Sequence, residues 1–212
     1  MNRWIVKWLL IVSACTLGLI SCSGFSTKQP AVSDEVRQEA RVQVPCIVAL
    51  PVMADVHTDD SITYSKAAEL EKGAEFMDQQ LAEALKGRDN IRFLSQRQLT
   101  SLLPESEVAR AALLSKIGSA LKCNAVLETT ISRYTQRVGG EYGADSPASA
   151  TFSMKLFNTA DARVIWSTTF RETQESLMSN IMSAHKYGLK WLSVEELVTM
   201  GVEEKVEQCP YF

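Results

Sequence analysis

The spacing of hydrophobic positions predicts one helix with particular strength, over residues 65–86. Apolar residues recur there at steps of three and four and form a single stripe: Leu70, Ala74, Met77, Leu81, Ala84 and Leu85. Ser65 fits an N-cap, Lys86 suits the negative end of the helix dipole, and Gly87 suits the left-handed residue that follows. The stripe therefore predicts a helix that packs one side on a core.

Short apolar runs on either side of this helix predict strands. The run Cys46–Pro51 is continuously apolar and ends in proline, which is typical of a strand buried on both faces. Residues 91–95 form the next expected strand, followed by a short helix over residues 96–103. A further helix begins with Ser106 as its cap and ends at Lys122, with these residues on one face: Leu113, Ile117 and Leu121.

Three later runs predict an antiparallel meander: residues 125–136, 150–157 and 164–170. In the second run Phe152, Met154 and Leu156 alternate with polar residues, as they do in a half-buried strand. In the third run the shared face is formed by Val164, Trp166, Thr168 and Phe170. Residues 137–149, rich in glycine and charge, predict a flexible excursion between the first two strands.

The C-terminal part, from about residue 172, is predicted to be helical. One stripe consists of Leu177, Ile181 and Ala184, and Ser193 with Glu196 forms a capping box that opens a last helix. The expected core face of that helix is Val194, Leu197, Val198 and Val202. The order of elements predicts an α/β fold. It has a mixed sheet of early parallel strands and a C-terminal antiparallel meander, flanked by helices, with an extra C-terminal helical segment.

Composition excludes two broad classes of protein. Of 212 residues, 46% are hydrophobic and 22% are charged, which excludes a disordered chain. The formal net charge is −3, so the strong positive field on which nucleic-acid binding depends is missing.

The N-terminal segment has the features of an export signal. Arg3 and Lys7 precede an apolar run, residues 8–20, that is too short for a comfortable membrane span. Leu19–Cys22 resembles the bacterial lipobox, in which the cysteine receives acyl chains such as palmitate and becomes the mature N-terminus. Val12–Cys15 is a rival match, and an ordinary secretory signal with an incidental cysteine is the other alternative.

These features divide the chain into a signal peptide at 1–21, a lipidated tether at 22–44 and one periplasmic α/β domain at 45–212. Residues 23–44 show no apolar stripe; the alternative is that part of them pairs at a sheet edge. By resemblance to enterobacterial sorting signals, Ser23 favours anchoring at the periplasmic face of the outer membrane. Cleavage leaves 20 basic and 25 acidic residues, a net charge of −5.

Three cysteines, Cys46, Cys123 and Cys209, remain in an oxidising compartment that favours disulfides. Their wide spacing matches no zinc motif. We expect one bridge, from Cys209 to either Cys46 or Cys123, because neighbouring parallel strands rarely suit direct bridging. Three buried free thiols are the alternative.

Several motifs in order resemble a superfamily of envelope proteins. It includes the curli-secretion lipoproteins, the N-terminal domain of TolB and the lipoprotein activators of penicillin-binding proteins. The matching segments are Ile47–Pro51, Leu81–Leu85, Ile91–Leu103, Ile117–Ser132 and Lys155–Ser167. Cys123–Leu127 replaces the usual Gly-Ala-Asp form, and Ala162 stands where glycine is usual. The resemblance implies a domain like the anticodon-binding fold and no catalytic site. The long amphipathic hairpins with which the curli branch builds a barrel have no counterpart here.

Candidate chemistry is sparse. The one cluster of acids with histidine is Asp55, His57, Asp59 and Asp60; it suits a solvated loop better than a divalent ion site, because metal-ligand spacing is missing. His185 has no arguable catalytic partner. We therefore expect no catalytic residue, no metal and no cofactor.

The sequence thus favours a non-enzymatic outer-membrane lipoprotein that assists envelope assembly or regulation by binding another envelope protein. The expected contact loop contains Gly139, Gly140, Glu141, Tyr142 and Asp145, because mobile loops on rigid hairpins often carry function. One alternative is a subunit of an oligomeric secretion channel of the curli type, which makes a homo-oligomer a further expectation. A second is an envelope hydrolase with an unrecognised site.

Overall fold

The computed structural model describes residues 32–56, 62–102, 109–174 and 190–212. Contacts divide the chain into two units, residues 1–30 and 31–212, and every described element belongs to the second. Several sequence predictions lie outside the described residues: the signal peptide, Cys22, His57, Asp59, Asp60, Ser106, the stripe from Leu177 to Ala184, and His185.

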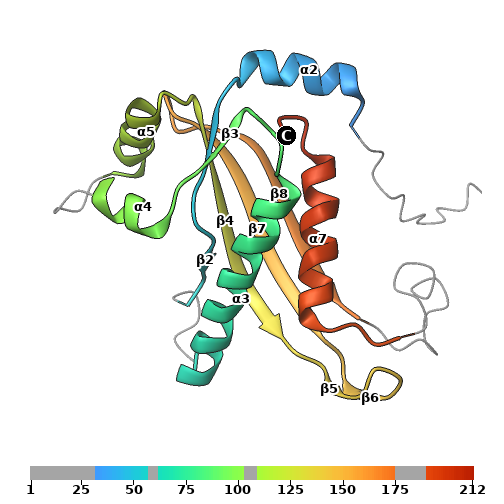
Figure 1. Cartoon of the computed structure of the whole chain (residues 1–212). Helices are drawn as coiled ribbons and strands as arrows, with labels where there is room; N and C mark the ends of the chain where they lie inside the picture. The colour runs from blue at the N-terminus through green and yellow to red at the C-terminus, as the bar shows by residue number, and fades with distance from the viewer. Residues whose placement is uncertain (1–31, 57–61, 103–108, 175–189) are drawn as a thin grey trace, which may run out of the picture. The chain divides into compact units, whose positions relative to one another are not determined.

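A mixed sheet of six strands forms the centre of the second unit (Figure 1). Its strands are β1 (Ile47–Ala49), β2 (Met53–Ala54), β3 (Ile91–Phe93), β4 (Ala125–Thr135), β7 (Ser149–Asn158) and β8 (Val164–Thr173). The main order is β3-β1-β4-β7-β8, and β2 pairs with the middle of β4, at Thr130 and Ile131. β3, β1 and β4 are parallel, whereas β4, β7 and β8 are antiparallel. The predicted fold class is confirmed.

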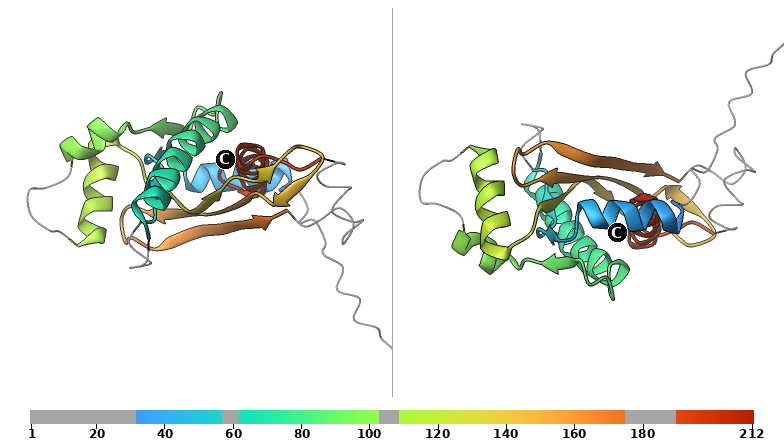
Figure 2. Two further views of the ribbon diagram at one scale, coloured as in Figure 1. Left: turned by 90° about the horizontal axis from the view of Figure 1, so that it is seen from below. Right: turned by 90° about the horizontal axis from the view of Figure 1, so that it is seen from above.

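Helices cover the sheet unequally. The helices are α2 (Asp34–Gln43), α3 (Tyr64–Ala84), α4 (Gln96–Leu102), α5 (Arg110–Leu121) and α7 (Val194–Gln208). α3 and α7 pack side by side on one face, where they share the larger core with β1, β4, β7 and β8. α4 and α5 cover the other face only at its parallel end, around Val48 and Val126. Figure 2 shows the far side of β7 and β8 without a helix among the described residues. None of the described helices is long and apolar enough to cross a membrane.

α3 follows its predicted pattern closely. Leu70, Ala74, Met77 and Leu81 are buried in the core, and Gly87 is left-handed as expected, with φ of 79°. The N-cap is Thr63 rather than Ser65, because the Thr63 hydroxyl accepts the bond from Lys66 N at 3.4 Å. The helix lies so close to β4 at Gly73 that an added Cβ would meet the Tyr134 ring at 2.5 Å.

Truncating the stripe of α3 is expected to destabilise the domain. Leu81 is 1% exposed, so Leu81→Ala removes fully buried methyl groups and leaves a cavity, at a cost of about 2–5 kcal/mol in the free energy of unfolding. Gln79→Ala, on the exposed side of the same helix, is the control and should change that free energy by less than about 0.5 kcal/mol. Urea denaturation measures both. Equal stability of the two variants would show that the stripe does not form the core contact.

α2 corrects part of the predicted tether at 22–44, because residues 34–43 form a helix. The Ser33 hydroxyl caps the helix, and Ala40 and Val44 are buried. The Arg37 guanidinium donates from Nη1 to Phe212 O at 3.2 Å and from Nη2 to Glu207 O at 2.6 Å. The helix is thus docked by contacts with the other end of the chain, which its own sequence pattern does not reveal.

The disulfide also corrects its prediction. Cys46 is joined to Cys123, with the two Cα atoms 4.7 Å apart, and Cys209 is a buried free thiol. The bridge between neighbouring parallel strands is possible because both cysteines precede their strands and lie outside the ladder, which begins at Ile47 and Ala125. That Cα separation lies within the ordinary range for disulfides.

The meander forms in the predicted order, with one difference at the start of β8. The register shifts between Leu156 and Phe157, so that Leu156 pairs with Trp166 but Phe157 pairs with Val164. Because paired residues share a face, Val164 lies on the side of Phe157 and not with Trp166 as predicted. Val164 is 44% exposed.

Candidate functional site

The segment predicted as a flexible excursion is a short β-ribbon. β5 (Val138–Gly139) pairs antiparallel with β6 (Ala144–Ser146), and Gly140 N donates to Gly143 O at 2.8 Å across the turn. Gly139 has φ of 107°, and an added Cβ there would lie 2.6 Å from Gly143 O, so this position requires glycine. Glu141 and Tyr142 therefore occupy a defined turn rather than a loose loop.

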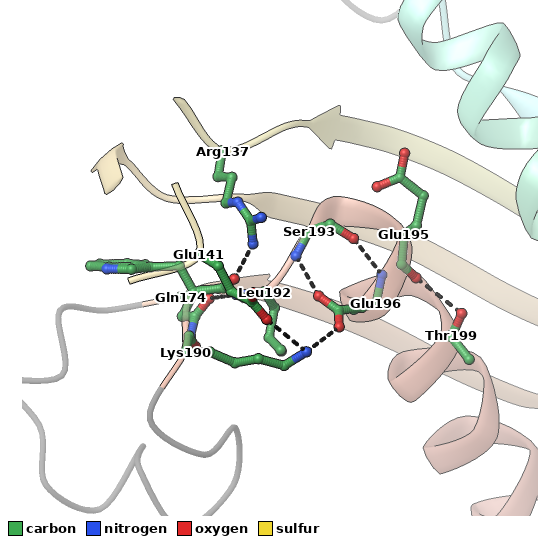
Figure 3. A network of polar contacts seen from close by, with 10 residues as sticks. Arg137, Glu141, Gln174, Lys190, Leu192, Ser193, Glu195, Glu196 and Thr199 are labelled. Atoms are coloured by element: carbon green, nitrogen blue, oxygen red, sulfur yellow. Dashed lines mark hydrogen bonds and ion pairs between the residues drawn. The ribbon is translucent and has the colours of Figure 1, made fainter. Parts of the chain in front are cut away.

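Contacts with residues 190–196 hold this ribbon in place (Figure 3). Lys190 pairs with Glu141 at 3.4 Å and with Glu196, in the first turn of α7, at 2.7 Å. Trp191 N donates to Glu141 O at 2.7 Å, and the Arg137 guanidinium donates to Trp191 O. We call this set of contacts the clasp; it fastens the ribbon both at its base and beside its turn.

Residues 190–196, which supply one side of the clasp, are themselves held in place by polar contacts. The buried Gln174 side chain donates to Lys190 O at 2.8 Å and accepts from Leu192 N at 2.7 Å. The predicted capping box is confirmed: Ser193 N donates to the Glu196 carboxylate at 2.8 Å, and Glu196 N donates to Ser193 Oγ at 3.2 Å. The clasp is therefore anchored to the end of β8 and to the start of α7.

Charge at the clasp is complementary. The hydrogen bond with Lys190 is the largest of the effects that lower the pKa of Glu196, and the same bond raises the pKa of Lys190. Both groups are exposed enough for solvent to screen the pair, so the clasp positions the ribbon more than it stabilises the fold.

The ribbon presents an exposed aromatic side chain. Tyr142 is 84% exposed at the turn, Val138 is 57% exposed, and the other predicted contact residues are exposed on the same ribbon: Gly139, Gly140, Glu141 and Asp145. The structure thus brings all five predicted residues together. Sequence reasoning missed Arg137 and Lys190, because the contacts Arg137–Trp191 and Lys190–Glu141 join residues more than 45 positions apart in the chain.

The described residues hold few groups suited to catalysis. Among them, no cluster of three or more His, Cys, Asp or Glu could hold a metal ion. Burial raises the pKa of the Cys209 thiol to about 12, so this thiol stays protonated and unreactive near neutral pH. Of the predicted acidic cluster only Asp55 is described, and its backbone N donates to Ile131 O at 2.8 Å.

Comparison with known proteins gives similarity in structure only. No protein-family model matches the sequence, and no curated protein matches it. The PelC dodecamer from Paraburkholderia phytofirmans is similar at a TM-score of 0.44 and 13% identity, covering 78% of this chain and 86% of that one. The LpoB C-terminal domain from Escherichia coli has a TM-score of 0.33 and 15% identity, covering 66% of this chain and 96% of the domain. Lipoprotein GNA1162 from Neisseria meningitidis has a TM-score of 0.33 and 16% identity, with coverages of 66% and 88%.

All three structures are at most 16% identical to this chain, and their TM-scores are below 0.5. Similarity at this level concerns the arrangement of strands and helices and carries no conclusion about activity.

Proposed function

We propose that this chain is a non-enzymatic lipoprotein, anchored through Cys22 at the periplasmic face of the outer membrane, which binds another envelope protein through the β5–β6 ribbon. The observation that carries the proposal is the exposed Tyr142 on a turn held by the clasp. The lipobox-like Leu19–Cys22 supports the anchor, and Ser23 supports the choice of membrane.

An exposed tyrosine on a turn that the clasp holds suits protein binding for physical reasons. Its ring offers a large apolar area together with a hydroxyl that can hydrogen-bond, and tyrosine is enriched among residues that dominate interface energies. Because the clasp already fixes the turn, binding does not have to order this part of the backbone, and that lowers the entropic cost of association. The neighbouring Val138 extends the apolar contact along the ribbon.

Tyr142→Ala is expected to weaken partner binding without unfolding the domain. A central tyrosine anchor contributes on the order of 2 kcal/mol, so crosslinking to the partner in the native envelope should fall about tenfold or more. Tyr64→Ala is the matched control, since Tyr64 is 92% exposed at the start of α3 and distant in sequence from the ribbon. Chemical crosslinking followed by mass spectrometry, together with the melting temperature of each variant, measures the effect.

The two tyrosine variants separate a contact at the ribbon from a general loss of surface aromatic area. Equal crosslinking in Tyr142→Ala and wild type would contradict the proposal, as would an equal loss in both variants. Point substitution is preferable to shortening residues 137–149, because shortening would also remove the Arg137 and Glu141 contacts of the clasp.

A further inference from the structure

Opposite sides of the second unit carry opposite charge. On α3 the exposed charged side chains are five acidic and two basic: Glu69, Glu71, Glu75, Asp78, Glu83, Lys66 and Lys72. On the other side of the sheet, the face of β4, β7 and β8 that turns away from α3 carries three basic side chains and one acidic: Arg133, Lys155, Arg171 and Glu128. Although the whole chain has a net charge of −3, this face of the sheet is cationic among the described residues.

This cationic face, which we call the open sheet face, is laid out in rows across three strands. Arg133 pairs with Thr151, and Thr151 pairs with Arg171, so the two arginines flank one threonine. The next row, nearer the start of β4, contains only hydroxyl side chains: Thr130, Ser153 and Thr169. Among the described residues no helix covers these rows (Figure 2).

Acidic and basic side chains offset each other in the row of Glu128 and Lys155, but not in the row of Arg133 and Arg171. Glu128 lies directly opposite Lys155 and is also engaged by the Arg110 guanidinium, which lies 4.4 Å from the centre of the Phe157 ring. Arg133 and Arg171 are exposed, and no carboxylate within the described part of the chain forms an ion pair with either. An anionic surface that approaches the sheet would therefore be attracted to the arginine row.

The acidic side of α3 has a matching spacing. Glu71, Glu75 and Asp78 follow at steps of four and three on one side of the helix, and Asp78 also accepts a bond from Val52 N at 3.2 Å. The rise of an α-helix places the backbones of Glu71 and Asp78 about 10 Å apart. Two strand spacings place the backbones of Arg133 and Arg171 about 10 Å apart as well.

From this complementarity of sign and spacing we infer that the open sheet face binds α3 of a second copy of this chain. In this arrangement the carboxylates of Glu71 and Asp78 meet the guanidinium groups of Arg133 and Arg171, and the threonine and serine hydroxyls donate to Glu75. Because the two surfaces lie on opposite sides of the unit, the contact is head-to-tail and can repeat from copy to copy.

The contact is small and should be weak between freely diffusing molecules. The arginine row and the hydroxyl row span only about 10 Å by 7 Å between backbones, well below the area of a stable interface. Confinement of all copies to one membrane surface raises their effective concentration and allows a weak contact to form. This step rests on the proposed lipid anchor, whereas the surfaces themselves do not involve the β5–β6 ribbon.

Charge reversal in the full-length chain tests the inference. Two copies with different affinity tags are expressed together, crosslinked in the native envelope and co-purified. Arg133→Glu with Arg171→Glu, or Glu71→Lys with Glu75→Lys, placed in both copies should lower co-purification by about tenfold or more, because like charges then face each other. Combining the first double variant in one copy with the second in the other copy should restore it.

A matched control variant and further measurements separate this contact from other causes of a change in co-purification. Arg97→Glu with Lys116→Glu changes the net charge by the same amount on α4 and α5 and should leave co-purification unchanged. Tyr142→Ala should also leave it unchanged, which separates this contact from the proposed partner site, and membrane fractionation separates it from the anchor. Absence of co-purification in wild type, or failure of the mixed pair to restore it while both variants melt normally, would overturn the inference.

Discussion

Replacing Cys46 and Cys123 together by alanine is expected to lower the free energy of unfolding by about 4 kcal/mol. The bridge closes a loop with a sequence separation of 77 residues, and closing so long a loop removes much of the conformational freedom of the unfolded chain. It also ties β1 to β4 at the parallel end of the sheet. Chemical denaturation under oxidising conditions measures the difference.

The reduced form provides the control for this experiment. A thiol reductant should destabilise wild type to the level of the alanine variant and should not destabilise the variant further, since the buried Cys209 forms no bridge. Peptide mapping of the oxidised protein should recover Cys46 linked to Cys123. Recovery of a peptide pair containing Cys209, or equal stability of wild type and variant, would contradict the assigned bridge.

Changing Cys22 to alanine is expected to abolish membrane attachment or to block processing of the precursor. Acyl chains supply membrane affinity of about 0.8 kcal/mol per buried methylene, so loss of the acylated cysteine removes the anchor altogether. Fractionation of the envelope and the mass of the mature protein measure the effect. Cys15→Ala, at the rival motif, is the matched control and should change neither location nor mass.

The result would go against the anchor if Cys22→Ala kept the membrane location and the mass of wild type. A loss in Cys15→Ala instead would move the acylation site to the rival motif Val12–Cys15 and lengthen the segment before α2.

Local sequence signals predicted the regular elements well. The stripe of α3, the left-handed Gly87 and the capping box of Ser193 with Glu196 all depend on residues within a few positions of one another, and the structure confirms each. The meander was predictable for the same reason, because alternation along a strand reports which side is buried. The single error in it, at Val164, comes from a register shift that alternation alone does not show.

Features that depend on distant contacts were not predictable from the pattern. The helix α2 is held by Arg37 through carbonyl groups 170 and 175 residues away, and the clasp joins Glu141 to Lys190. The Cys46–Cys123 bridge depends on where two strands begin and not on the spacing of cysteines. The five residues of the expected contact loop were chosen because they lie in a glycine-containing loop on a hairpin. The contacts that hold their ribbon come from the clasp, whose other residues lie far along the chain.

The central claim is that the turn carrying Tyr142 touches a protein partner, and a photo-activated crosslinking side chain placed at that position tests it most directly. The same side chain at Tyr64, which is 92% exposed against 84% for Tyr142, serves as the control. We predict that irradiation of living cells gives a defined crosslinked product at position 142, containing one envelope protein other than this chain, and no such product at position 64. Absence of a product at position 142 in folded, correctly located protein, or the same products at both positions, would contradict the account.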